Sequence, residues 1–340
     1  MTSSSAVESR VQAAILVFRG AVEKLQLPAR REQDAPVAVL VDPGFHDPLA
    51  SDEHVKEAPR VQVTGPGTNP AQQPYILMPA GMRAYERIVS ASLRLAIEES
   101  VGVHDREGLR PRSVCAWLVP KDVQAPDWSE IARAFSARTV VVAPGSSGTR
   151  QVFRFWDPRV ASQLTSAVGA AAWSECLSSL GLSQWWAVNE AGELARMDEL
   201  PTPAAKSRER SSAWAFDARQ WKALEFLRWR NCLSQAAYAW GVEPGPSSAV
   251  LDDIVRRALN FGLADEADIR SFAYLALAVN PRFDALHEVR LALRQWDAEG
   301  RCAGGFSARV QAWSDDFLEQ LSRAEGFPAA ALGAQTSSRL

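Results

Sequence analysis

A short polar segment gathers side chains that could bind a metal ion or carry protons. Between residues 42 and 54 the chain has two histidines and four carboxylates: Asp42, His46, Asp47, Asp52, Glu53 and His54. Histidine and aspartate are common metal ligands and common general acids or bases. The spacing matches no zinc motif, and a solvated loop after a buried strand explains the same composition. We expect neither a metal nor a cofactor here. One alternative stays open, a metal-dependent or acid–base hydrolase that uses Asp42, His46 and Asp157.

Other reactive residues give weaker signals. The Gly-Ser-Ser-Gly loop at 145–148 lacks the Lys of a phosphate-binding loop and precedes a strand, so we interpret it as a hairpin tip. The four cysteines are far apart and form no C-x-x-C pair, which predicts free thiols in a reducing cytoplasm. They are Cys115, Cys176, Cys232 and Cys302.

The most distinctive segment reads FRFWDPRV, residues 153–160. Pro158 suits the first position of a helix, where its missing N–H is not needed. Asp157 suits the N-cap position, where its carboxylate can accept a hydrogen bond from a first-turn N–H. The segment therefore predicts a strand over residues 151–156 that runs directly into a helix.

Successive side chains of this predicted strand should lie on opposite faces. Arg154 falls on the side of Trp156, opposite Phe153 and Phe155. Because an unpaired buried charge is costly, we expect a carboxylate to pair with Arg154. Such a pair would organise the strand–helix corner, and direct contact with a partner is the other interpretation.

The charge balance argues against a nucleic-acid partner. The chain carries 37 Lys and Arg against 40 Asp and Glu, a net charge of −3. Residues 206–230 interleave basic residues with Trp214, Trp221 and Trp229, a pattern that also describes an amphipathic helix with a solvated face. We prefer the helix, since the whole chain is acidic. No signal peptide and no apolar run of about 18 residues is present, so we expect no membrane insertion.

The order of elements predicts an α+β protein of 340 residues with two lobes. Short β-branched runs and two hairpins predict a mostly antiparallel or mixed sheet with helices over residues 1–198. Polar, Pro-containing residues 199–213 are the predicted linker, residues 214–328 a helical lobe and residues 329–340 a flexible tail. One of the predicted helices in the second lobe spans residues 307–324.

Tryptophan is unusually abundant, with 12 Trp against 4 Tyr. Most of these rings should be core, because a buried Trp is common when its N–H finds a partner. The exposed ones would be candidates for partner contacts. Our candidates for partner binding outside the 153–160 segment are Asp42, Tyr75, Trp185, Trp186, Trp221 and Trp229.

The 153–160 segment resembles the signature of the type VI secretion effector-adaptor family, also called effector chaperones. That signature is a strand ending in Phe-Arg-aromatic-aromatic, followed by Asp-Pro-Arg and a helix, and it is matched here by Phe153, Arg154, Phe155, Trp156, Asp157, Pro158 and Arg159. Weaker matches are the strand 37–42 that ends in Asp, the segment 73–77 around Tyr75, and the runs 258–269 and 281–284. The resemblance covers roughly residues 10–300.

The resemblance implies a protein without enzymatic activity. Members of this family hold a toxic effector in the cytoplasm of the Gram-negative donor cell and load it onto VgrG, the trimeric spike protein. The implied partners are therefore a VgrG spike and a cognate effector, and the implied role of the signature residues is structural or partner-binding.

Overall fold

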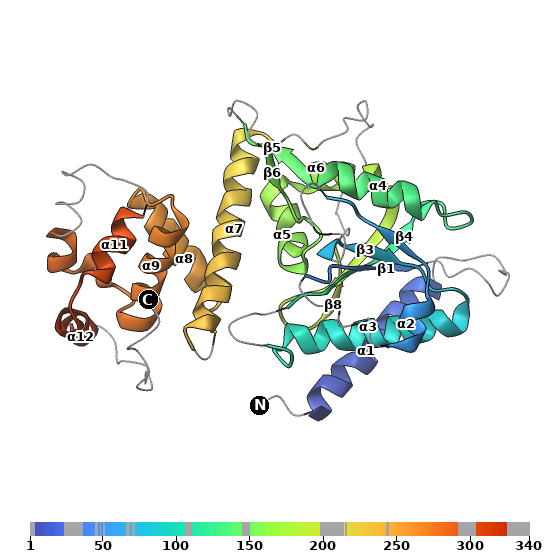
Figure 1. The fold of residues 1–340 in the computed structure, drawn as a ribbon, viewed down its shortest axis with the longest axis horizontal. Helices are drawn as coiled ribbons and strands as arrows, with labels where there is room; N and C mark the ends of the chain where they lie inside the picture. The colour runs from blue at the N-terminus through green and yellow to red at the C-terminus, as the bar shows by residue number, and fades with distance from the viewer. Residues whose placement is uncertain are drawn as a thin grey trace. The chain divides into compact units, whose positions relative to one another are not determined.

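The computed structural model describes an α+β protein (Figure 1). Its chain divides into two compact units, Met1–Asp105 with Arg110–Leu224, and Arg106–Leu109 with Glu225–Leu340. The predicted fold class, an antiparallel sheet with helices followed by an all-helical region, is confirmed. The described residues are 4–23, 37–44, 47, 49, 52–65, 69, 72–105, 111–144, 150–197, 214, 216–242, 245–291 and 304–324.

The first unit is built on a six-stranded sheet whose neighbouring strands are all antiparallel. In sheet order the strands are β2 (Arg60–Gln62), β3 (Tyr75–Leu77), β1 (Ala38–Val41), β4 (Val114–Pro120), β7 (Leu182–Val188) and β8 (Leu194–Arg196). Every residue of the central strands β1 and β4 is buried, as their continuous apolar sequences predict.

Helices cover both faces of this sheet. α1 (Ser4–Glu23) and α3 (Met82–Ser100) lie together on one face, and α4 (Trp128–Arg138) and α6 (Ala170–Ser179) lie on the other (Figure 1). Consecutive strand residues point to opposite faces, so the ring of Trp186 packs on Phe18 of α1, and the ring of Trp185 packs on Phe135 and Trp173. Both faces of the sheet are therefore core.

A second, two-stranded sheet precedes residues 153–160, the signature segment. β5 (Val140–Val142) pairs antiparallel with β6 (Arg150–Val152), which confirms the predicted hairpin, whose predicted tip lies outside the described residues. The predicted strand over residues 151–156 is too long, because β6 ends at Val152. In the last backbone hydrogen bond between the two strand segments, the Phe153 N–H donates to the Thr139 carbonyl. A turn follows, in which the Asp157 N–H donates to the Arg154 carbonyl.

The second unit is helical and has its own core. It contains most of α7 (Ala218–Ala239), then α8 (Ser248–Asn260), α9 (Glu266–Tyr274), the π-helical stretch η2 (Leu275–Val279), the short 3-10 helix η3 (Phe283–Ala285), α11 (Gly305–Gln311) and α12 (Asp315–Arg323). The single helix predicted over residues 307–324 is wrong. Ser314 accepts a hydrogen bond from the Phe317 N–H and starts a new helix there.

Two predicted segments fall where the structure gives no description, namely the linker 199–213 and the tail 329–340. None of the described helices is long and apolar enough to cross a membrane.

Candidate functional site

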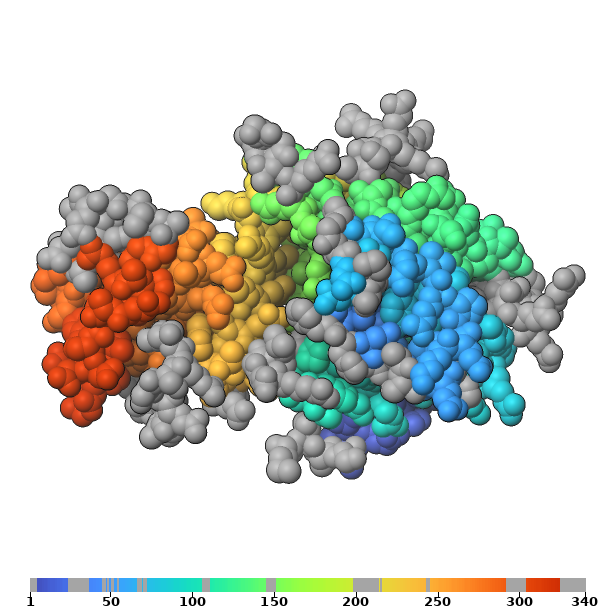
Figure 2. All heavy atoms as spheres, in the orientation of Figure 1, coloured from blue at the N-terminus to red at the C-terminus, as the bar shows by residue number. Residues whose placement is uncertain are grey.

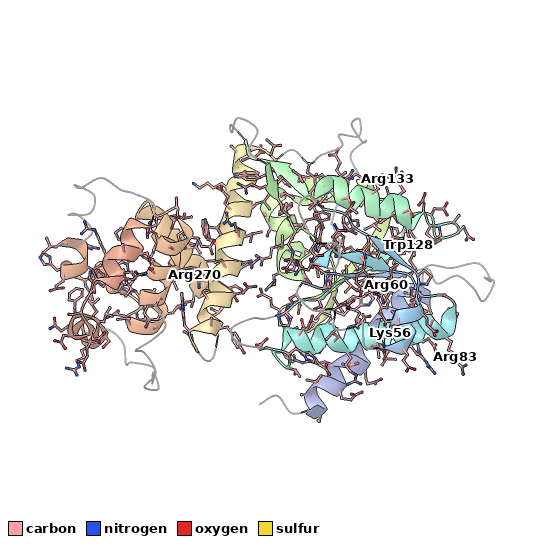
Figure 3. All side chains as sticks on the ribbon, viewed as in Figure 1. Lys56, Arg60, Arg83, Trp128, Arg133 and Arg270 are labelled. Carbon is pink, nitrogen blue, oxygen red and sulfur yellow. The ribbon has the colours of Figure 1, made fainter. Side chains whose placement is uncertain are left out.

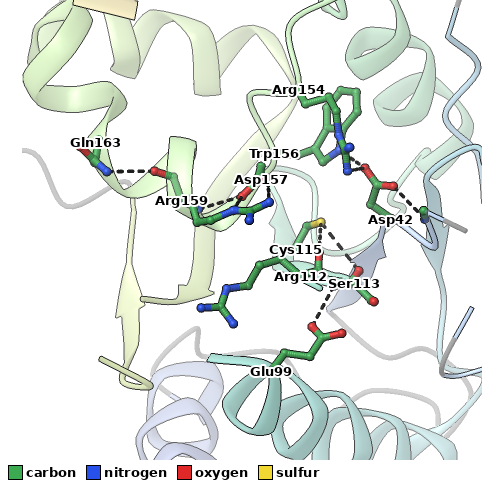
Figure 4. A network of polar contacts seen from close by, with 11 residues as sticks. Asp42, Glu99, Arg112, Ser113, Cys115, Arg154, Trp156, Asp157, Arg159 and Gln163 are labelled. Atoms are coloured by element: carbon green, nitrogen blue, oxygen red, sulfur yellow. Dashed lines mark hydrogen bonds and ion pairs between the residues drawn. The ribbon is translucent and has the colours of Figure 1, made fainter. Parts of the chain in front are cut away.

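One carboxylate joins the end of β1 to the signature segment. Asp42 follows β1 directly and is 5% exposed. Its Oδ2 atom accepts hydrogen bonds from Arg154 Nη2 at 2.5 Å and from Trp156 Nε1 at 2.8 Å (Figure 4). The expected carboxylate partner of Arg154 is thus found, 112 residues away in the sequence. Arg154 and Trp156 lie on the same side, as predicted, although a turn and not the predicted strand carries them.

The environment favours the charged form of Arg154. Burial works against the charge of Arg154, but Asp42, together with the neighbouring Cys115 and Asp157, outweighs it and raises the pKa of the guanidinium. The second carboxylate oxygen of Asp42 accepts from the Gly44 N–H at 3.3 Å, and the Asp42 N–H donates to the Ser113 carbonyl. Asp42 is therefore held both by Ser113, directly before β4, and by the signature segment.

A second carboxylate–arginine pair follows within the same segment. Asp157 caps α5 (Pro158–Val168) by accepting from the Arg159 N–H, and Pro158 is the first helical residue, as predicted. The side chain of Arg159 returns to the same carboxylate through Nε at 2.9 Å and Nη2 at 2.5 Å. Burial opposes the charge of Asp157, but Arg159 outweighs it and lowers the pKa of the carboxyl group. The Asp-Pro-Arg sequence thus fixes the start of α5.

A third group of polar residues beneath this corner was missed by the sequence analysis (Figure 4). Glu99 of α3 is 1% exposed and accepts the Ser113 N–H at 2.8 Å, and burial raises the pKa of its carboxyl group. Arg112 is also in this group, where burial and the neighbouring Arg159 lower the pKa of its guanidinium. The buried positions of α3 recur with helical spacing and include Glu99, so its periodicity could have revealed this residue.

The aromatic residues of the signature segment enter one cluster of rings. Phe155 is fully buried and stacks on Phe135, with ring centroids 5.3 Å apart. Its ring also lies 4.4 Å from that of Trp214. The half-buried Phe153 contacts the rings of Phe155, Trp214 and Phe216. The two sides of the segment thus have different tasks, ion pairing on one and apolar packing on the other.

The other candidate partner residues are mostly core. Tyr75, Trp185, Trp186 and Trp229 are all less than a tenth exposed. The hydroxyl of Tyr75 donates to Asp47 at 2.9 Å, and its ring belongs to the hydrophobic core. Trp221 of α7 is half-buried, and it is the candidate tryptophan whose ring stays partly open to solvent.

The possible metal and hydrolase residues do not come together in the described part of the chain. His46 and the side chain of His54 lie outside it. Among described residues no group of three His, Cys, Asp or Glu could hold a metal ion. The two remaining hydrolase residues, Asp42 and Asp157, each bind a different arginine. Three cysteines are described, and all are free thiols.

Exposed cations of the first unit are interspersed with acids. Lys56, Arg60, Arg83 and Arg133 come from α2 (Glu53–Glu57), β2, α3 and α4 (Figure 3). On the five residues of α2, two glutamates accompany Lys56, and the guanidinium of Arg60 lies 3.6 Å from Asp47. The surroundings of Lys56 and Arg60 are therefore of mixed charge.

Comparisons with protein families, with curated proteins and with solved structures found no match to this chain. Function is therefore inferred from the residues and their contacts. The contacts at the corner fasten three segments to one another: the end of β1, the start of β4 and the start of α5. Such an arrangement can hold a binding surface in a fixed shape.

Proposed function

We propose that this protein is an effector adaptor of a type VI secretion system. It binds a toxic effector in the cytoplasm of the producing bacterium and delivers it to the VgrG spike. Binding energy alone performs this task, so the proposal needs no catalytic group and no cofactor.

The observation that carries the proposal is the contact between two separate parts of the family resemblance. The strand ending in Asp42 and the segment 153–159 are far apart in the sequence, and each resembles the family independently. Arg154 and Trp156 both donate to Asp42, so the residue types that carry the resemblance depend on one another. This dependence supports a shared fold with that family rather than a chance match of one motif.

The signature also has groups that stay open to a partner. The side chain of Arg154 is 52% exposed although its tip binds Asp42, and the ring of Phe153 is half-buried. Arginine and aromatic residues are enriched in protein–protein contacts. A partner segment that touches this corner would therefore meet an arginine already fixed in position, which lowers the entropy lost on binding.

The test is co-expression of the tagged chain with the VgrG and toxin genes that neighbour its own gene. We expect both products to be retained with the chain through size-exclusion chromatography. Phe153→Ser should weaken retention of one partner, and Arg83→Glu, a change at an exposed cation of α3, is the control that should not. Circular dichroism melts establish that both variants are folded.

Two results would argue for a different function. If neither product is retained, the adaptor proposal is wrong. If the purified chain hydrolyses a substrate and His46→Ala abolishes the turnover, the protein is an enzyme of the kind left open above.

A further inference from the structure

The β5–β6 hairpin has an apolar face that is open to solvent. Val141 of β5 is 2% exposed, so the other face of this strand carries Val140 and Val142. The register sets Val140 opposite Val152 of β6 on that face. Val142 is 45% exposed and Val152 is 57% exposed. In Figure 2 the green spheres of α4 and of the hairpin form part of the surface of the first unit.

The outer edge of β6 offers backbone groups to a further strand. The Phe153 N–H donates to the Thr139 carbonyl, so alternate residues of β6 turn their backbone groups toward β5. Val152 and Arg150 therefore turn their N–H and carbonyl groups away from β5. Among the described residues, none donates to the Val152 carbonyl or accepts from its N–H. Such a row of backbone groups pairs with an extended segment of another chain.

Val152 is an unusual residue for an uncovered edge. Proteins protect such edges with prolines or charges, or cover them. A hairpin of two strands is also marginally stable until a third strand or a packed layer supports it. A strand added beside β6 would cover the Val152 side chain and would satisfy its N–H and carbonyl at the same time.

The charge around this edge indicates which kind of strand would bind. Residues 131–156 contain four arginines and no Asp or Glu, although the whole chain has a net charge of −3. Two of these arginines, Arg150 and Arg154, come two positions before and two positions after Val152. The side chain of Arg154 pairs with Asp42 and is still 52% exposed. An acidic segment therefore complements this edge.

The same charges argue against a second copy of this chain as the added strand. Antiparallel pairing of two β6 strands about Val152 would set Arg150 of one copy opposite Arg154 of the other. Like charges directly opposite each other destabilise a sheet. The edge therefore favours a different chain.

We propose that the β6 edge, residues 150–154, binds an extended acidic segment of another protein as an added antiparallel strand. The segment has an apolar residue opposite Val152 and an acidic residue two positions to either side of it. Backbone hydrogen bonds supply affinity, and the side chains select the segment. Only the identity of the partner, an effector or a spike, rests on the proposed adaptor function.

The test is selection of short random peptides, displayed on phage, against the purified full chain. We expect the selected peptides to share an apolar residue with acidic residues two positions away on both sides. Val152→Pro should weaken the binding of a selected peptide at least about tenfold, because proline has no N–H to donate. The pairing of β6 with β5 should survive this change, since that N–H points away from β5. A thermal melt verifies that the variant is folded.

Two controls separate the backbone from the side chains. Val152→Thr keeps the N–H and the branched shape, so it should bind the peptide nearly as tightly as the wild type. Arg150→Glu should weaken binding of the acidic peptide. The matched change Arg83→Glu, at an exposed cation of α3, should not.

Hydrogen exchange gives a direct signature of strand addition. In the free chain the Val152 amide should exchange fast, whereas the Phe153 amide is protected by its bond to Thr139. The bound peptide should protect Val152 and leave Phe153 as it was.

Three results would overturn the proposal. They are a selection that yields no binding peptide, a selected peptide that binds Val152→Pro as tightly as the wild type, and a Val152 amide that exchanges equally fast in the complex. The selection uses neither a spike nor an effector, so its failure is distinct from failure of the co-expression test.

Discussion

At the scale of single residues, the central feature is a carboxylate shared by two donors. Asp42 is buried and binds both the guanidinium of Arg154 and the indole N–H of Trp156. A buried carboxylate is costly unless its oxygens are satisfied. The two hydrogen bonds therefore offset the free-energy cost of burying Asp42. Asp42 in turn holds the strand–helix corner in one conformation.

The first prediction concerns the coupling of this pair. Arg154→Ala should destabilise the protein by about 1–3 kcal/mol, less than for a fully buried pair because its side chain is half exposed. Asp42→Asn removes the charge that Arg154 compensates, so the double variant should lose less than the sum of the two single variants. Urea unfolding measures the free energy of unfolding of the two single variants and of the double variant. Additive losses would mean that the two residues act independently.

The second prediction concerns the buried carboxyl group of Glu99. Burial raises its pKa above the ordinary value of 4.5, so the fold favours the protonated form. This contribution is fully present below about pH 4.5 and is lost as the pH rises through the raised pKa. Glu99→Gln, which is neutral at every pH, should therefore raise the melting temperature at neutral pH and change it little near about pH 4. An equal change in melting temperature at both pH values would contradict a raised pKa of Glu99.

At the scale of elements, two helices begin with the same kind of cap in different surroundings. Asp127 caps α4 by accepting from the Glu130 N–H at an exposed site. Asp157 caps α5, is nearly buried and also binds the side chain of Arg159. The signature sequence thus adds an ion pair to an ordinary helix start.

The third prediction compares these caps. Asp127→Ala should cost about 1 kcal/mol, the usual value of a lost cap. Asp157→Ala should cost more, because it also leaves Arg159 without its bidentate partner in a mostly buried site. Chemical denaturation of the two variants gives the comparison directly. Equal losses would show that the Asp157–Arg159 pair adds nothing to the cap.

Local patterns predicted much of this arrangement, because their causes are local. The apolar run of β1, the β5–β6 hairpin and the cap at Asp157 all follow from neighbouring residues. The end of β6 at Val152 does not, since the turn that follows is held by Asp42, more than a hundred residues earlier.

The pairing of Arg154 with Asp42 could not be predicted from neighbouring residues either. Alternation identified the side of the segment on which Arg154 lies, but several carboxylates could have met it there. Only the strand order, which places β1 next to β4, brings the end of β1 to this corner.

At the scale of the whole molecule, the tryptophan excess is mainly a property of one core. Among the described residues eight tryptophans are buried, and seven of these belong to the first unit. Trp214 is one of the seven, and its ring contacts those of Phe153, Phe155 and Trp173. The chain beyond the predicted linker therefore contributes to the first core before the helical unit begins.

The fourth prediction follows from this placement of Trp214. Trp214→Ala should destabilise the first unit by about 3 kcal/mol, as expected for a large ring lost from a core. A fragment of residues 1–224 should melt at a higher temperature than a fragment of residues 1–213, which lacks this ring. Identical melting of the two fragments would show that Trp214 does not stabilise the unit.

The fifth prediction concerns bridging, which is the central claim for the whole protein. The direct measurement is retention of the purified cognate effector on immobilised VgrG, with and without this chain. We predict that the effector is retained only when the chain is present, and that all three proteins elute together. Equal retention of the effector without the chain, or none with it, would contradict the claim that this protein is an adaptor.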